Sequence, residues 1–126
     1  MATAPLFELI DVGYTQQGAE ILADISWQID PEQHWAVLGP NGSGKSTLLK
    51  IAAGYLWPTS GCVRRRGEEL IDLGELRRSM GWISNDIVSL IPPSETGIET
   101  VISGKFGQFG LRKLPVFAPT EEDLDR

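Results

Sequence analysis

The chain has 126 residues, of which 41% are hydrophobic and 22% are charged, a balance that excludes a disordered tail and allows one domain of ordinary size. No apolar run reaches the roughly 18 residues that a membrane span needs. The single cysteine, Cys62, excludes an intrachain disulfide, and with one histidine in the sequence it excludes a zinc finger.

The net charge of −6 is unevenly distributed along the sequence. Residues 1–44 contain six acidic side chains and no Lys or Arg, so that Lys45 is the first cation. Because a secretory signal or transit peptide needs a basic amino-terminal region, we expect a cytoplasmic protein. Four acidic residues lie between the arginines at 64–66 and those at 77–78, which favours a solvated, salt-bridged face over a nucleic-acid surface.

The first half of the chain predicts three strands and a helix. Residues 6–12 are rich in β-formers, and residues 16–19 are typical of a turn. Apolar residues at the odd positions of 21–29 predict a half-buried antiparallel strand. Residues 34–38 form a continuous apolar run, as expected of a strand covered on both faces. Residues 45–53 predict a helix, and Gly54 stands where its C-terminal cap belongs.

The second half of the chain has weaker patterns. We expect a loop over 57–61, a strand over 62–66, one or two helical turns within 70–78 and a short strand over 80–84. A region rich in Pro, Gly and Ser follows, with a short helix over 99–103. Thr120, followed by three acidic residues, predicts the start of a last helix over 120–126.

One segment carries clear chemistry. Between the predicted buried strand and the predicted helix lies the pattern G-x-x-x-x-G-K-[ST], which in this context indicates a phosphate-binding P-loop. Its glycines let the backbone curl so that its N–H groups can hold phosphate, and the helix start adds its positive dipole end. The predicted ATP-binding residues of this loop are Gly39, Pro40, Asn41, Gly42, Ser43, Gly44, Lys45, Ser46 and Thr47.

Three residues of the loop have distinct predicted roles. Lys45 should reach the β- and γ-phosphates as a point charge, and the Ser46 hydroxyl should be a ligand of Mg²⁺. Thr47 should hydrogen-bond near the α-phosphate. The alternative is a glycine-rich strand–helix turn that matches the pattern by chance.

Together with its neighbours, this P-loop resembles that of the ATP-binding cassette (ABC) ATPases, the nucleotide-binding subunits of ABC transporters. The resemblance runs from Val12-Gly13-Tyr14 through residues 21–29, 35–54 and 58–61, and it covers residues 6 to about 85. It implies an α/β P-loop NTPase fold, an ABC-ATPase-like core with an antiparallel β subdomain. The expected division is an ATP-binding core over 1–90 and the start of a truncated α-helical subdomain over 91–126.

The resemblance also assigns two residues outside the loop. Tyr14 matches the aromatic residue that stacks on adenine in this family; the less favoured alternative is an ordinary tyrosine at a strand end. Asn85 stands where the family places a glutamine that reaches Mg²⁺ and the attacking water. Since asparagine is one methylene shorter, its contact with the metal is either direct or bridged by water. The resemblance thus implies Lys45 and Asn85 as the catalytic residues present.

Two family motifs are absent from the sequence. Hydrolysis in this family needs an Asp for Mg²⁺ and a Glu as general base after four apolar residues, and no such run occurs. The signature that contacts ATP on the opposite subunit is also missing. Residues 102–105 match it only in part, and we interpret them as the end of a short helix. This chain alone is therefore predicted to be inactive as an ATPase.

Three hypotheses follow. The favoured one is the amino-terminal half of an ABC-type ATPase subunit, which binds ATP and Mg²⁺ and, when complete, couples hydrolysis to solute transport. Its expected partners are a second ATPase subunit in a homodimer and a membrane permease, with no nucleic acid, and it would lie at the inner face of the membrane. The alternative is a non-hydrolysing fragment or degenerate ABC module. A small P-loop kinase is disfavoured because it would need an Arg-rich lid.

Overall fold

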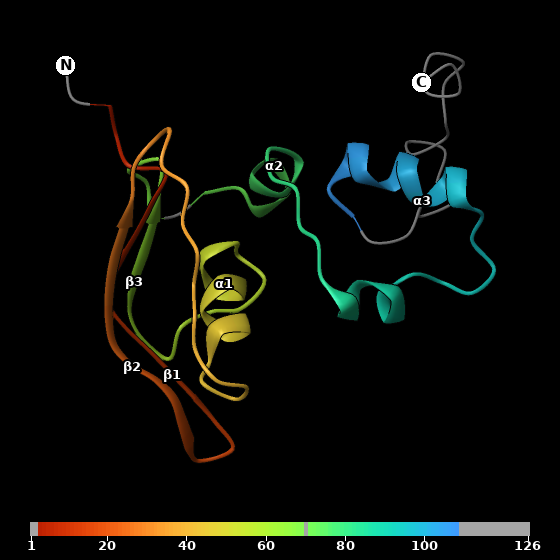
Figure 1. Ribbon diagram of the computed structural model, residues 1–126. Helices are drawn as coiled ribbons and strands as arrows, with labels where there is room; N and C mark the ends of the chain where they lie inside the picture. Colours follow the sequence, from red (N-terminus) through yellow and green to blue (C-terminus); the bar gives the residue numbers. More distant parts are fainter. Residues whose placement is uncertain (1–2, 70, 109–126) are drawn as a thin grey trace. The chain divides into compact units, whose positions relative to one another are not determined.

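The computed structural model describes residues 3–69 and 71–108 (Figure 1). They belong to two compact units, one ending at Ile71 and one beginning at Asp72. The sequence-based boundary after residue 90 concerns functional domains and stays a prediction. None of the helices in the described ranges is long and apolar enough to cross a membrane.

A three-stranded antiparallel sheet forms the frame of the first unit. Its strands are β1 (Phe7–Gln16), β2 (Ala19–Ile29) and β3 (Ser60–Arg65), in the order β2, β1, β3. Strands β1 and β2 are joined by Gln17 and Gly18, whose φ values of 50° and 80° suit a type I′ hairpin turn. The predicted antiparallel β subdomain is confirmed, and the first strand is longer than expected because the pairing continues past Gly13.

Irregularities in β1 and β2 change which residues face the core. Asp11 and Asp24 have φ values of 48° and 50°, and the β1–β2 register shifts between Leu9 and Val12. Each added residue turns the following side chains to the other face of the sheet. Leu22 is therefore buried and Ala23 exposed, so the predicted alternation is wrong there and resumes only after Asp24.

Helix α1 (Lys45–Ala52) packs on one face of this sheet (Figure 1). The helix ends as predicted: Gly54 has a φ of 77°, its N–H donates to Ile51 O, and Tyr55 N–H donates to Lys50 O. This pair of bonds is a Schellman motif, which satisfies the last carbonyls of the helix. The buried core shared by helix and sheet consists of Leu9, Val12, Leu22, Ile51, Ala52 and Val63.

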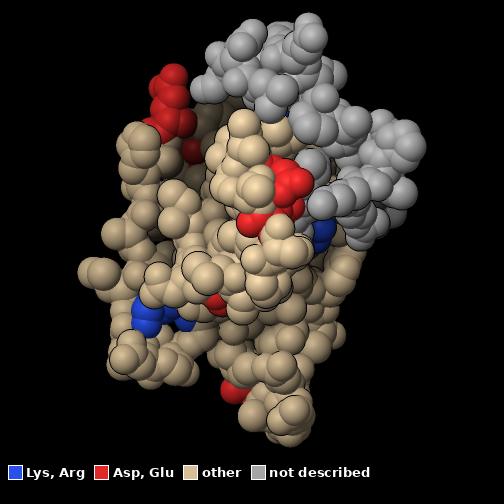
Figure 2. Space-filling view, turned by 90° about the vertical axis from the view of Figure 1, so that its right-hand side faces the viewer, with Lys and Arg blue, Asp and Glu red and all other residues tan. Residues whose placement is uncertain are grey.

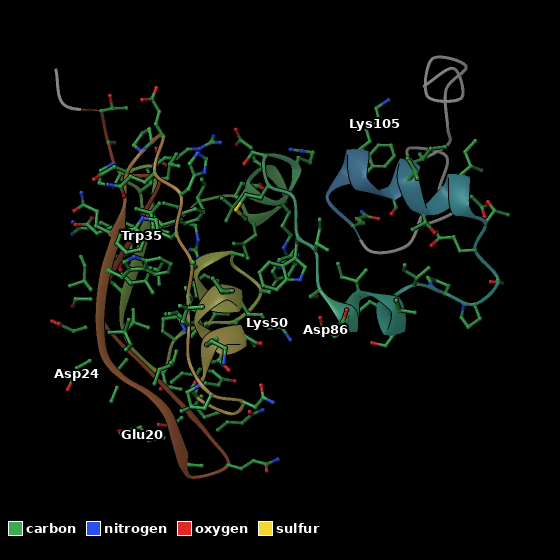
Figure 3. All side chains as sticks on the ribbon, in the orientation of Figure 1. Glu20, Asp24, Trp35, Lys50, Asp86 and Lys105 are labelled. Carbon is green, nitrogen blue, oxygen red and sulfur yellow. The ribbon has the colours of Figure 1, made fainter. Side chains whose placement is uncertain are left out.

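The strand predicted over residues 34–38 is absent. No described strand exchanges backbone hydrogen bonds with this segment, and Leu38 is 90% exposed. A strand covered on both faces needs a hydrogen-bonded neighbour and covering layers, and the described residues supply neither. The segment comes after β2 in the chain without joining the sheet. The rings of Trp35 (Figure 3) and Trp27 meet edge to face, with their centroids 5.5 Å apart.

The second unit contains short helices. They are α2 (Leu73–Arg78), the 3₁₀ helix η1 (Asn85–Leu90), α3 (Gly97–Ser103) and the 3₁₀ helix η2 (Gly104–Phe106). Asp72 caps α2 by accepting from Glu75 N–H, and Thr96 and Glu99 form a capping box at α3.

The predictions for this unit have mixed outcomes. The predicted helices over 70–78 and 99–103 are confirmed. The strand predicted over 80–84 is wrong, because no described strand pairs with that apolar run. The helix predicted over 120–126 lies outside the described residues.

Candidate functional site: a phosphate-binding loop

The backbone of residues 39–47 curls tightly before it enters α1. Ser43 N–H donates to Pro40 O at 3.2 Å, and Leu48 N–H donates to Gly44 O at 2.9 Å as the first helical bond. Gly42 and Gly44 have φ values of 80° and 93°, a region that L-residues rarely adopt. Left-handed residues just before a helix start form a concave array of N–H groups that suits anions.

Close packing explains why two of these positions are glycines. A Cβ at Gly39 would stand 2.8 Å from Ser43 Oγ, inside the loop. A Cβ at Gly44 would stand 2.9 Å from Leu22 Cδ2 and 3.1 Å from the carbonyl oxygen of Ile21. The loop therefore closes on itself at one end and packs directly on β2 at the other.

Lys45 spans the opening of the loop. Its Nζ donates to Gly39 O and Pro40 O, both at 2.7 Å, and to Ser43 Oγ at 3.3 Å. An ammonium has three donors and no acceptor, so these bonds fix the charge beside the curled backbone. The ammonium charge therefore lies beside the loop, and its contact with phosphate stays a prediction.

Ser46 and Thr47 occupy the first turn of α1, Ser46 exposed and Thr47 half-buried. An exposed hydroxyl beside the phosphate loop fits Mg²⁺, which prefers oxygen ligands and keeps several waters. The donor set of the loop, with its N–H groups, one ammonium and one exposed hydroxyl, therefore fits a magnesium-bound triphosphate.

The structure brings Tyr14 to the same end of the sheet as the loop. Tyr14 lies on β1 directly opposite Leu22 of β2, and Leu22 is the residue against which Gly44 packs. The side chain of Tyr14 is half-buried and packs against the core cluster. Its predicted role as a platform for adenine stays a prediction.

Asn85 is the first residue of η1, is exposed and belongs to the second unit, whereas the loop belongs to the first. Its role at the metal therefore stays a prediction. His34, the single histidine of the sequence, is exposed. Across the described residues, no group of three His, Cys, Asp or Glu side chains could hold a metal ion.

Sequence reasoning missed the role of Arg65. The pattern placed it on a solvated, salt-bridged face, and for Arg64 that is confirmed, since its NH1 lies 3.7 Å from Glu8 Oε2. Arg65, in contrast, is 3% exposed and donates to Ala52 O at 2.9 Å and to Ile51 O at 2.6 Å. Strand alternation with Val63 was the available signal for its burial.

Arg65 thus supports the C-terminal end of the helix that begins with the phosphate loop. A cation at this end interacts favourably with the helix dipole. Burial lowers the pKa of the Arg65 guanidinium from its usual value, because desolvation disfavours the charged form. Arginine nevertheless stays protonated in proteins, so the charge is retained at neutral pH.

Figure 2 shows how charged side chains of the described residues are distributed on one face. On the face shown in Figure 2, Lys and Arg side chains occur as separate spots among acidic and uncharged ones. On β2, the side chain of Asp24 points away from α1 (Figure 3). The expectation that the protein binds no nucleic acid stays a prediction.

A P-loop leading into a helix that packs on an antiparallel sheet defines a nucleotide-binding protein of the P-loop class. The family model described as "ABC transporter" matches residues 22–120. The chain therefore belongs to the ABC transporter family, as the sequence resemblance indicated.

Curated relatives agree with this assignment. The chain is 34% identical over 113 residues to the uncharacterized ABC transporter ATP-binding protein YlmA of Bacillus subtilis, covering 87% of this chain and 43% of that protein. It is 40% identical over 81 residues to the energy-coupling factor transporter ATP-binding protein EcfA1 of Halalkalibacterium halodurans, covering 62% and 29%. The chain spans less than half the length of these relatives.

Two solved structures share the fold. CbiO1 from Clostridium perfringens, described as part of the ABC transporter complex cbiONQ, matches with a TM-score of 0.57 and 31% identity, covering 62% of this chain and 33% of that one. A bacterial Atm1-family ABC exporter with ATP bound matches with a TM-score of 0.60 at 19% identity, covering 100% of this chain and 25% of that one, which shows a likeness of fold alone.

Proposed function

We propose that this chain is the amino-terminal, nucleotide-binding part of an ABC-type ATPase subunit and that residues 39–47 bind MgATP. The observation that carries the proposal is the position of the Lys45 ammonium. It lies 2.7 Å from two carbonyls of a loop that contains two left-handed glycines. Such a loop presents N–H groups and a fixed charge to the same ligand, which is the requirement for holding a triphosphate.

Each group has a separate task in this proposal. The loop amides and Lys45 bind the β- and γ-phosphates, and Thr47 bonds near the α-phosphate. The Ser46 hydroxyl holds Mg²⁺, which neutralises phosphate charge when bound. Tyr14, at the same end of the sheet, stacks on adenine, and Asn85 reaches the metal directly or through a water.

The relatives' names support a role for the whole protein in transport, since they include a phosphonates import protein and an energy-coupling factor transporter protein. We propose that the whole protein hydrolyses ATP with a second ATPase subunit as partner and drives a membrane permease from the cytoplasmic face. This chain contributes binding rather than turnover, because its sequence contains no Asp-Glu pair after an apolar run.

The test is calorimetric titration of the protein with MgATP, comparing the unmodified form with Lys45→Ala. Loss of charge-assisted bonds should weaken binding about 100-fold. Lys105→Ala is the matched control, because Lys105 lies in η2 of the other unit, and it should bind MgATP unchanged. Equal affinity of the Lys45→Ala variant and the unmodified protein would refute the proposal.

A second candidate is a nucleotide-binding module that never hydrolyses ATP, favoured by the missing general base. Steady-state phosphate release by the whole protein separates the two, because only the first candidate predicts release there that Lys45→Ala abolishes. For the chain of 126 residues we expect no release above the Lys45→Ala background. Release that disappears in Lys45→Ala would show that the chain hydrolyses ATP by itself and would contradict the binding-only role.

A further inference from the structure

Thr59 lies in the loop between α1 and β3 and contacts the backbone on both sides of Tyr14. Its own N–H donates to Gly13 O at 2.9 Å. Its hydroxyl donates to the same carbonyl at 3.2 Å and accepts from Thr15 N–H at 3.0 Å. Through these three hydrogen bonds, Thr59 holds the backbone of the residue before Tyr14 and of the residue after it.

The chain next to Thr59 approaches β1 too closely to shift freely. A Cβ placed at Gly13 would collide with Ser60 Oγ, and one placed at Gly61 would collide with the carbonyl oxygens of Ile10 and Asp11. Gly61 also has a φ of 74°. This tight crossing holds the Thr59 hydroxyl in place, so its bonds to β1 are constrained by the surrounding backbone.

The local irregularity of β1 makes such support necessary. The β1–β3 register shifts between Ile10 and Gly13, and the β1–β2 register shifts on both sides of Tyr14. Regular strand pairing therefore does not fix the direction of the Tyr14 side chain. The bonds of Thr59 replace part of the missing ladder at this point.

We propose that Thr59 is a positioning residue for the adenine platform: by holding Gly13 and Thr15 it sets the orientation of the Tyr14 ring. The inference rests on the proposed function, in which Tyr14 stacks on the base. A stacking platform gains affinity only if its ring is held in the plane of the base, because immobilising a free side chain costs affinity. Thr59 thus acts on base recognition and has no part in phosphate binding.

The chemistry of the hydroxyl allows a matched pair of variants. A hydroxyl donates and accepts at once, which both backbone contacts require. Thr59→Val keeps the size and β-branching of the side chain and removes both bonds, whereas Thr59→Ser keeps the hydroxyl. Since Thr59 is exposed, neither change opens a cavity in the core.

The experiment measures, in the whole protein, the affinity for MgATP and for magnesium tripolyphosphate, which lacks the base and the sugar. Tyr14→Leu should weaken MgATP binding by roughly 5- to 10-fold, as expected for a lost stacking contact. Thr59→Val should weaken it about 3-fold or more, Thr59→Ser should restore it, and tripolyphosphate should bind all forms equally.

The remaining outcomes are equally decisive. If Thr59→Val weakens both ligands alike, or has no effect while Tyr14→Leu does, Thr59 does not position the platform. In the Tyr14→Leu background, a further loss caused by Thr59→Val would likewise overturn the inference. If Tyr14→Leu itself leaves MgATP affinity unchanged, the role of Tyr14 fails, and if Lys45→Ala leaves tripolyphosphate binding unchanged, the phosphate site fails.

Discussion

The two units of the chain differ in how much apolar surface they bury. In the first, Leu9, Val12 and Ile51 are at most 2% exposed and join helix to sheet. Among the described residues of the second, only Leu76 and Ile102 are buried hydrophobics, while exposed apolar side chains occur in both units, such as Leu38 at 90% and Ile83 at 98%. The phosphate loop belongs to the unit with the continuous core, because a loop that must hold its N–H groups fixed needs packed supports.

Helix α1 illustrates this difference. With eight residues it is too short to be stable as an isolated helix. Its apolar residues pack on the sheet, and Arg65 of β3 donates to its last carbonyls. The contacts of Arg65 at the C-terminal end of α1 and the packing on the sheet thus also hold the start of the helix, where phosphate would bind. The helices of the second unit depend more on local caps such as the Thr96–Glu99 box.

The largest expected effect comes from the core of the first unit. Ile51→Ala removes a side chain that is 0% exposed and should lower the free energy of unfolding by about 3–4 kcal/mol. Urea denaturation followed by tryptophan fluorescence measures the change. A loss under about 1 kcal/mol would mean that this core relaxes easily and would remove the contrast between the units.

Arg65→Met should have the next largest effect. Two carbonyls of α1 lose their donors, which costs about 2 kcal/mol, although the apolar replacement also removes the desolvation cost of the charge. Arg64→Met is the matched control on the same strand: it breaks only a partly exposed ion pair and should change stability by less than about 1 kcal/mol. Equal effects of the two changes would show that burial of Arg65 does not matter.

Gly44→Ala tests the loop itself. The φ of 93° and the close approach to Leu22 should make the substitution destabilising by about 1–2 kcal/mol and should weaken MgATP binding. Gly104→Ala in the second unit is the control, since Gly104 has a φ of −61° and open space around it. Melting temperature and titration with MgATP together report both effects. An unchanged affinity would show that the loop tolerates a side chain at residue 44.

The smallest effect is expected at the surface of the second unit. Val101→Ala changes a side chain that is 78% exposed and should alter the free energy of unfolding by less than about 0.5 kcal/mol. Ile102→Ala, one position along α3, removes a side chain that is 5% exposed and should cost about 2 kcal/mol. Thermal unfolding compares them. A large loss for Val101→Ala would show that this surface is covered in solution.

The sequence by itself determined the local features. The glycine pattern predicted the tightly curled loop before α1, whose binding of phosphate stays a prediction. Gly54 marked the end of the helix, and the turn at residues 16–19 joined two antiparallel strands. The capped helices of the second unit were also found. These features are predictable because each depends on residues within a few positions of one another, whose φ values and hydrogen bonds are set locally.

Only the tertiary structure decided which residues are buried and which strands are paired. The bulges near Asp11 and Asp24 placed Leu22 in the core. Arg65, expected at the surface, is buried and bonds the end of α1, and residues 34–38 form no strand. The contacts of Thr59 around Tyr14 join residues 44 and 46 positions apart. The periodicity of apolar residues describes one segment at a time. Burial and strand pairing depend on which other segments pack against it, and only the folded chain brings those segments together.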